Sequence, residues 1–233
     1  MVGVIVNVIT VILGSCIGLL CKKKISEKIN SVVMIGLGVC TLYIGISGSL
    51  EGENPIVAIL SIVLGVIIGT LLNIDGCINS LSNKVAMKFK KEDDKTSIAE
   101  GLLTSTLLFC IGSMTITGSL KAGLTGDNSI LITKAMLDFV SSMMLASSLG
   151  IGVLLSSVSV FVIQGLLVLL SFFVSPILTI SAINELTCVG SLLIIMIGTN
   201  LMGITKIKVA DFLPAIIFAP IFHYLILFLT NLF

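Results

Sequence analysis

Charged residues are scarce in this 233-residue sequence, and arginine and tryptophan are absent altogether. Charged residues make up 11% of the chain and apolar residues 56%, and the mean hydropathy is +1.22. An ordinary soluble domain carries about 25% charged residues, because its surface must be covered by polar groups. The composition therefore excludes a cytosolic enzyme, a nucleic-acid-binding protein and a disordered chain, and it indicates an integral membrane protein.

Histidine is nearly absent too, since His223 is the only one, and the six cysteines contain no Cys-x-x-Cys pair. Metal centres and disulfide frameworks need ligands at recognisable spacings, so we expect no cofactor. No phosphate-binding Gly-Lys-Ser/Thr loop is present, which argues against a nucleotide-driven pump. An enzyme is not expected either. A Ser–Lys dyad on Lys134 is conceivable, but Asp138 one turn away favours a charged lysine.

Long apolar windows predict the fold, because a spanning helix needs about 20 mostly apolar residues. Eight windows meet this requirement: Val2–Cys21, Ser31–Leu50, Pro55–Asn73, Ile98–Leu120, Ser129–Ser148, Val153–Val174, Glu185–Gly203 and Val209–Leu229. The stretch 129–174 could be two full spans or one broken, re-entrant element. The sequence predicts an all-α polytopic membrane protein with about eight spans, forming a single transmembrane domain over residues 1–233.

The lysines predict the orientation. Eleven of the 13 fall in the first, third and seventh connections, at residues 22–28, 84–95 and 206–208. The positive-inside rule assigns these connections to the cytoplasm. Both termini are then extracytoplasmic, in the plasma membrane, and the count of spans is even. No lysine precedes the first apolar window, so we expect a retained anchor and not a cleaved signal peptide.

The connection 74–97 is the longest polar segment. Its apolar residues recur at helical spacing along Ile74, Ile78, Leu81, Val85 and Phe89. This pattern predicts an amphipathic helix, either lying in the cytoplasmic membrane interface or acting as a plain linker. Elsewhere, Gly14-x-x-x-Gly18 and Gly65-x-x-x-Gly69 have the spacing that lets helices pack closely in lipid.

Two residue patterns recur within the sequence and suggest internal repeats. Ile29-Asn30, Gly36 and Ile44-Gly45 recur as Ile183-Asn184, Gly190 and Ile197-Gly198, and Asn7 has a plausible counterpart in Gln164. Spans one to three would then match spans six to eight in the opposite direction, an inverted repeat typical of secondary transporters. The other pattern relates Cys40 and Ile46–Leu50 to Cys110 and Ile116–Leu120 at an offset of 70. It points to a helix hairpin used repeatedly in parallel.

Charged and amide side chains inside spans are costly and are therefore candidate functional groups. Lys134 and Asp138 stand one helical turn apart on one face of span five, near the midplane, and Gln164 lies at a similar depth. Ser141 and Ser142 continue that face. Asp138 and Gln164 offer the oxygen ligands that a hard cation prefers. The alternative is an ion pair that only locks helices together.

Three further polar residues are candidates. Glu100 begins span four and Glu185 begins span seven, where each either contributes to a site or simply meets the helix dipole. Asn7 either binds the ion or joins two helices by a hydrogen bond. Pro214 and Pro220 predict a kink in span eight.

The chain also resembles the YdfK/YqgA family of small bacterial inner-membrane proteins, a domain of unknown function. The resemblance rests on Gly3, Asn7, Gly14, Gly18, Glu100-Gly101, Leu107, Phe109–Gly112, Met114, Gly118–Leu120, Gly126-Asp127, Lys134, Asp138, Ala146–Val153, Gln164-Gly165, Glu185, Gly190 and Leu213–Ala215. Members are often labelled a possible sodium channel or pump. The family pattern has Asn where this chain has Asp211, which either alters a gate or stays solvated beside Lys208.

These patterns predict a transporter or channel for a small cation, sodium or proton, working by alternating access at a polar site near the midplane. Its partners would be the lipid bilayer and the cation, with a homo-oligomer possible and no nucleic acid. The alternative is a membrane scaffold or accessory subunit without transport activity of its own.

Overall fold

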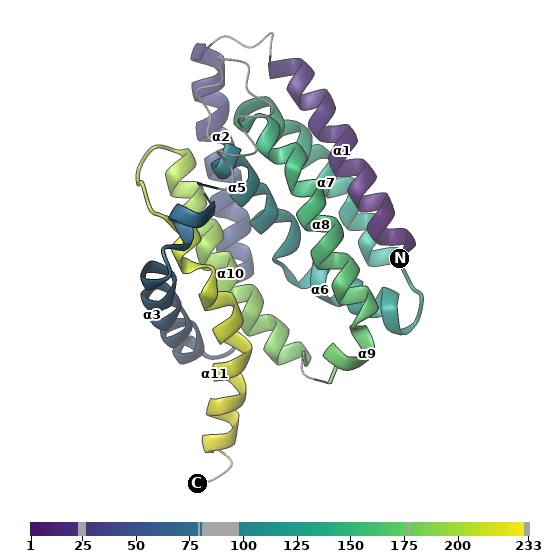
Figure 1. Cartoon of the computed structure of the whole chain (residues 1–233), viewed down its shortest axis with the longest axis vertical. Helices are drawn as coiled ribbons and strands as arrows, with labels where there is room; N and C mark the ends of the chain where they lie inside the picture. The colour runs from purple at the N-terminus through teal and green to yellow at the C-terminus, as the bar shows by residue number, and fades with distance from the viewer. Residues whose placement is uncertain (23–26, 79, 81–97, 177, 231–233) are drawn as a thin grey trace.

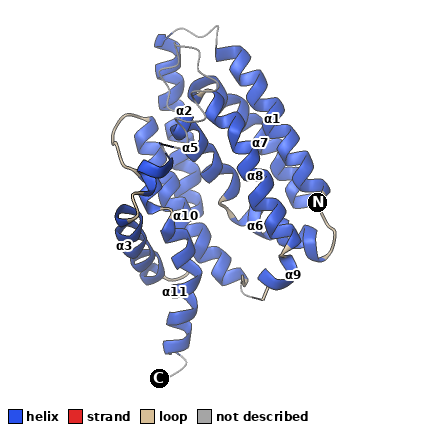
Figure 2. Ribbon diagram, viewed as in Figure 1, coloured by secondary structure: helices blue, strands red, loops and turns tan. Residues whose placement is uncertain are grey.

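The computed structural model describes residues 1–22, 27–78, 80, 98–176 and 178–230, and of residues 22, 27–30 and 113 the backbone only (Figure 1). Every regular element in these ranges is helical (Figure 2). The elements are α1 (Val2–Lys22), α2 (Glu27–Ser49), α3 (Pro55–Leu71), α5 (Ile98–Cys110), α6 (Ser113–Leu124), α7 (Ser129–Leu149), α8 (Ile151–Leu169), α9 (Ser171–Val174), α10 (Ile180–Leu201), the 3-10 helix η1 (Val209–Phe212) and α11 (Pro214–Thr230).

Six candidate spans of the described chain are long and apolar enough to cross a membrane. They are Val2–Cys21, Ser31–Ser49, Ser129–Leu149, Ile151–Leu169, Ile180–Leu201 and Val209–Thr230. The bent pair α5 and α6 would make a seventh, and α3 is a shorter apolar helix of 17 residues. Large apolar side chains lie exposed along these helices, as lipid-facing residues do. The all-α, multi-pass membrane fold is confirmed, and the count of eight spans stays a prediction.

The span predicted over Ile98–Leu120 is bent in the structure, because α5 and α6 meet at an angle of 58° and form either one broken span or a re-entrant loop. Gly112, between them, has a φ of 148°, a backbone conformation that glycine adopts readily and other residues rarely do. In 129–174, α7 and α8 each have the length and apolar character of a span, which favours two full spans over a re-entrant element. Only Gly150, with a φ of 78°, separates them.

The helices form two lobes (Figure 1). In the first lobe α1 packs along α7, and α8 packs against α1, α5 and α6. In the second lobe α2 packs along α10, and α3 packs along α11, which also contacts α10. Contacts of α10 with α5 and α6, and of α2 with α7, join the lobes more sparsely.

Small residues account for the closest helix contacts, as the spacing of the glycines predicted. A Cβ on Gly14 would strike the Phe139 carbonyl and the Ser142 hydroxyl of α7, and one on Gly18 would strike the Met143 carbonyl. In the second lobe Gly65 lies against Ala215 of α11. Because these backbones nearly touch, α1 is held tightly on α7.

Other boundaries differ from prediction. α10 begins at Ile180, so Glu185 lies in its second turn and not at its start. Pro214 opens α11, and only Pro220 lies inside that helix. Residues 74–78 are helical, whereas most of the predicted amphipathic helix, residues 79 and 81–97, lies outside the described residues.

Candidate functional site

The predicted pair Lys134 and Asp138 is buried in α7. The Lys134 Nζ lies 2.5 Å from the Asp138 Oδ2, and the two residues are only 6% and 5% exposed. The ammonium also lies 5.9 Å from the centre of the Phe109 ring. Removing two charges from water is costly unless they pair and find further hydrogen bonds, so the surroundings of the pair decide what it does.

Two amide side chains, Asn7 of α1 and Gln164 of α8, lie beside the Lys134–Asp138 pair. The Asn7 Nδ2 donates to the Asp138 Oδ2 over 3.0 Å and to the Gln164 Oε1 over 3.2 Å. Both amide residues are fully buried. We call these four residues, Asn7, Lys134, Asp138 and Gln164, the polar cluster. Helix α1 and the consecutive helices α7 and α8 thus bring together four residues that sequence reasoning had named as candidates.

The polar cluster is not fully satisfied. The Asn7 Oδ1 and the Gln164 Nε2 are buried and have no hydrogen-bond partner in the structure. Both hydrogen bonds to the Asp138 carboxylate go to Oδ2, and the described residues offer no donor to its Oδ1. Unpaired polar atoms in an apolar interior cost free energy, so the cluster has spare capacity for a ligand or water.

A cavity of about 320 Å³ reaches the pair from the seam between the lobes. We call it the Lys134 cavity. Its wall comprises Tyr43, Ile44, Ser47, Gly48, Glu51, Leu108, Phe109, Ile111, Gly112, Met114, Thr115, Lys134, Leu137, Asp138, Ser141, Thr187, Ser191 and Ile194. Residues with hydroxyl groups from four helices, α2, α6, α7 and α10, therefore line the same space as the charged pair.

The break between α5 and α6 opens onto this cavity. Thr115 donates its hydroxyl to the Phe109 carbonyl over 3.0 Å and so satisfies one group freed by the break. Within 98–124, no backbone N–H donates to the Leu108 carbonyl. Irregular backbone is tolerated at membrane depth only where protein or a water-filled cavity satisfies it. The break thus leaves the carbonyl of Leu108, a residue of the cavity wall, without a helical hydrogen bond.

The two predicted serines differ. Ser141 lines the Lys134 cavity. Ser142 is buried, donates its hydroxyl to the Phe139 carbonyl over 3.0 Å and lies against Gly14. Ser142 therefore does not line the Lys134 cavity, because α1 covers that side of α7.

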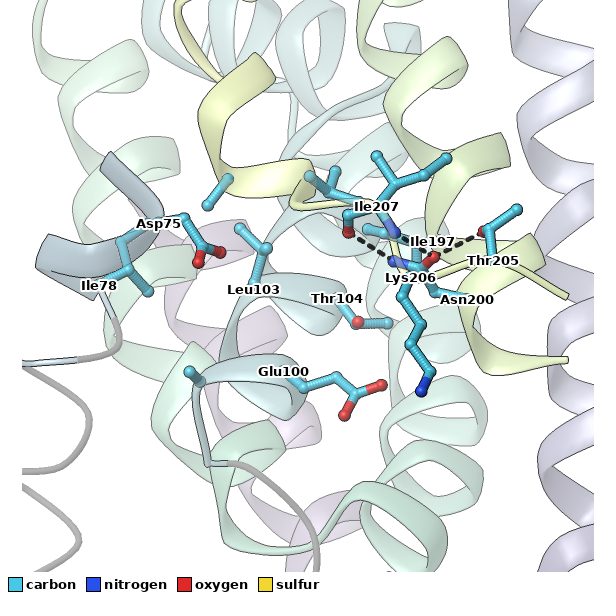
Figure 3. A pocket seen from close by; sticks show the side chains of 13 residues that line it. Asp75, Ile78, Glu100, Leu103, Thr104, Ile197, Asn200, Thr205, Lys206 and Ile207 are labelled. Carbon is cyan, nitrogen blue, oxygen red and sulfur yellow. Dashed lines mark hydrogen bonds between the residues drawn. The ribbon is translucent and has the colours of Figure 1, made fainter. Parts of the chain in front are cut away.

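Glu100 lies in a different cavity, of about 330 Å³, shown in Figure 3. We call it the Glu100 cavity. It is lined by Asp75, Ile78, Ala99, Glu100, Leu103, Thr104, Ile197, Asn200, Thr205, Lys206, Ile207, Val209 and Ala210. The Asn200 amide is used internally, donating to the Ile207 carbonyl and accepting from Thr205 and the Ile207 N–H. It shapes the cavity wall and does not join the polar cluster.

Glu185 is likewise separate from the polar cluster. It is fully buried, and its Oε1 accepts the backbone N–H groups of Glu53 and Asn54 over 3.0 and 2.7 Å. Asn184 strengthens the contact by donating to the Glu53 Oε1 over 2.9 Å. The carboxylate therefore fixes the connection between α2 and α3.

Asp211 is also buried, not solvated beside Lys208. It is 7% exposed, and its Oδ1 accepts the Asp75 N–H over 2.9 Å. Sequence reasoning missed this contact, along with the wall residues Phe109, Thr115 and Thr187. The Ile-Gly-Ser step at 111–113 was the one local signal for the break.

As for metals, no three His, Cys, Asp or Glu side chains cluster within the described part of the chain.

Comparison with known proteins places the chain in a family. It is 34% identical over 230 residues to the uncharacterized membrane protein YdfK of Bacillus subtilis (strain 168), covering 97% of each chain. It is 31% identical over 221 residues to the uncharacterized protein YqgA of Escherichia coli (strain K12), covering 94% of each. No solved structure matches. A family model described as "protein of unknown function (DUF554)" matches residues 2–224, and the chain therefore belongs to the DUF554 family of YdfK and YqgA.

Proposed function

We propose that this protein is a transporter or channel for a small cation, sodium or proton, operating by alternating access in the plasma membrane with both termini outside. One observation carries the proposal: the buried Lys134–Asp138 pair and the break between α5 and α6 line the same cavity. Ionisable groups inside a membrane mark ion pathways, and broken helices build the sites of secondary transporters.

The pair supplies a mechanism for coupling. With Lys134 bound, Asp138 is neutralised by an internal cation, so the pair carries no net charge before an ion binds. A proton or a sodium ion arriving in the cavity competes with the Lys134 ammonium for the carboxylate, whose Oδ1 has no donor among the described residues. Displacing Lys134 changes what α7 presents to the second lobe, which links ion binding to helix arrangement.

An inverted repeat is the architecture we propose for this mechanism. The helix pairs that pack most extensively are α1 with α7, α5 with α8, α2 with α10 and α3 with α11. The same four helix pairs result when each helix is exchanged with its proposed counterpart. The counterparts are α1 and α8, α2 and α10, α3 and α11, and α7 and the bent pair α5–α6. Such a pattern is what a two-fold axis between oppositely directed copies would give.

Local contacts support the same axis. Asn7 and Gln164, the counterparts suggested by the sequence, hydrogen-bond to each other. Gly38 and Gly198 approach reciprocally: a Cβ on either would lie 2.9 or 3.0 Å from the other's carbonyl oxygen. Gly45, the sequence counterpart of Gly198, makes the equivalent approach of 3.0 Å to the Ser191 carbonyl.

The test is cation flux in liposomes containing the purified protein, measured separately with a sodium and a proton gradient. Asp138→Asn should abolish the flux. The matched control is Asp127→Asn, which removes an aspartate paired with Lys121 over 2.8 Å but exposed in the α6–α7 connection. Lys121 and the Ser129 N–H hold the pKa of Asp127 well below its usual range, so this control also removes a negative charge.

The outcomes separate the alternatives. Flux lost in Asp138→Asn and kept in Asp127→Asn supports the proposed site. Flux unchanged in Asp138→Asn overturns it. Wild-type protein without flux under either gradient, but co-purifying stably with another membrane protein, would identify a scaffold or accessory subunit instead.

A further inference from the structure

The two cavities share two helices. The Lys134 cavity takes Leu108 and Phe109 from α5 and Ile194 from α10, and the Glu100 cavity takes Thr104 from α5 and Ile197 from α10. Along α10 the first cavity lies toward the amino end and the second toward the carboxyl end. The cavities therefore lie toward opposite ends of a common seam between the lobes.

Very little protein separates them. Ile194 and Ile197 are three residues apart, and Thr104 and Leu108 are four apart. At a rise of about 1.5 Å per residue, these separations are about 4.5 and 6 Å along the helix axes. The two cavities thus end about one helical turn from each other on both helices.

The layer between them is apolar. Phe109, Ile194 and Ile197 are buried, with exposures of 1%, 1% and 3%, and belong to one hydrophobic cluster. This layer occupies the seam where α5 and α10 contact each other sparsely. Apolar constrictions block ions because they exclude water, so these three side chains form a barrier that a small lobe displacement would open.

Each cavity also carries two acidic side chains and one basic side chain. Glu51, Asp138 and Lys134 line the first. In the second, the acidic residues are Asp75 and Glu100 and the basic residue is Lys206. Glu100 projects from the first turn of α5 and Lys206 from the segment after α10, and their charged ends point toward one another below Thr104 in the view of Figure 3. A cation that crosses the barrier from Asp138 would therefore meet a second carboxylate.

We propose that the Lys134 cavity and the Glu100 cavity are the two halves of one transport pathway along the α5–α10 seam, closed by the layer of Phe109, Ile194 and Ile197. This proposal rests on the proposed function and adds the route, its barrier and Glu100 as the carboxylate of the second half.

Cysteine labelling tests the route independently of flux. In a variant without the six native cysteines, Leu103→Cys places a thiol on the Glu100 cavity and Leu108→Cys places one on the Lys134 cavity. A membrane-impermeant thiol reagent should modify them from opposite faces of the vesicle, and should spare Leu102→Cys, which lines neither cavity. Modification of both from the same face, or of neither, overturns the route.

Passive flux tests the barrier in a chain that keeps its native cysteines. Ile197→Ala should raise passive cation flux by about tenfold, which corresponds to lowering the barrier by about 1.4 kcal/mol. Leu193→Ala removes the same number of carbon atoms from a fully buried position on α10 that lines neither cavity, and should not raise flux. Equal flux in the two variants overturns the barrier assignment.

The two proposals fail in different ways. Absence of flux in wild type and in Ile197→Ala, with labelling from opposite faces, contradicts cation transport but supports the route. Flux that depends on Asp138, with both thiols labelled from one face, supports transport and contradicts the route.

Discussion

Asn7 and Gln164 hydrogen-bond to each other over 3.2 Å in the middle of the first lobe, although 157 residues separate them in the chain. The same Asn7 amide donates to the Asp138 carboxylate. One side chain from the first helix thereby ties α7 to α8 and fixes the orientation of the buried carboxylate. The polar cluster depends on this amide as much as on its two charges.

Replacing Asn7 by leucine, which has a similar volume, should lower the free energy of unfolding by about 1.5–3 kcal/mol, because a hydrogen bond to a buried charged group is lost. Unfolding in detergent micelles, followed by circular dichroism, measures the change. Thr133→Val is the control. Its exposed hydroxyl bonds only to the Ser129 carbonyl of the same helix, so stability should stay within about 0.5 kcal/mol of wild type. Equal effects in the two variants would contradict a central role for Asn7.

Replacing only one residue of the Lys134–Asp138 pair should lower the free energy of unfolding more than replacing both. Lys134→Met or Asp138→Leu alone leaves an uncompensated buried charge and should cost about 3–5 kcal/mol. The double variant should cost clearly less than the sum of the two. A double-mutant cycle on unfolding free energies gives the coupling, and additive effects would show that the two side chains do not stabilise each other.

Gly14 and Gly36 should respond oppositely to alanine. Gly14→Ala places a methyl group against the Phe139 carbonyl of α7, and overpacking of this kind costs about 1–3 kcal/mol. Gly36→Ala meets nothing within 4 Å and should stabilise α2 by up to about 1 kcal/mol, because alanine favours a helix interior over glycine. Melting temperatures in the same detergent compare them. A stabilised Gly14→Ala would mean that α1 does not pack on α7 as described.

Glu185→Gln should loosen the connection between α2 and α3. The substitution keeps an acceptor oxygen but removes the charge, and charge-assisted hydrogen bonds are roughly twice as strong as neutral ones. Hydrogen exchange of the Glu53 and Asn54 amides should accelerate by about tenfold, equivalent to about 1.4 kcal/mol. The Val57 amide, bonded to the Asn54 carbonyl within the start of α3, serves as the reference. Unchanged exchange at residues 53 and 54 would remove Glu185 from this role.

Sequence patterns predicted what depends on apolar content and on charges in unusual places. Each predicted window corresponds to a helix or a bent helix pair, because lipid requires long apolar segments. Lys134, Asp138 and Gln164 stood out because polar groups are rare inside spans. Asn7 was matched to Gln164 by a repeat pattern, and the two prove to be in contact.

The remaining features depend on tertiary contacts that a linear pattern does not contain. A sequence does not show that α1 covers Ser142, or that Glu185 faces a connecting segment 131 residues away. At the break at Gly112, a hydrogen bond from the Thr115 hydroxyl replaces helical hydrogen bonds. The break lies beside a cavity whose walls come from several helices, and a linear pattern does not show that cavity. Glu100 and Asp138 lie in different cavities, and Phe109 packs with apolar residues of α10 between them. Hydropathy does not reveal such a tertiary contact.

All four residues of the polar cluster belong to α1, α7 and α8, hence to the first lobe, whereas both cavities take walls from both lobes. Glycine packing couples α1 to α7, and a single residue, Gly150, couples α7 to α8. A sliding or rocking of one lobe past the other would therefore move the cluster as part of one rigid unit, in which α1, α7 and α8 keep their mutual packing. The side of the membrane from which an ion reaches the cluster would then depend on the position of the cluster relative to the second lobe. A covalent cross-link between α7 and α2 should hold the cluster accessible from one side.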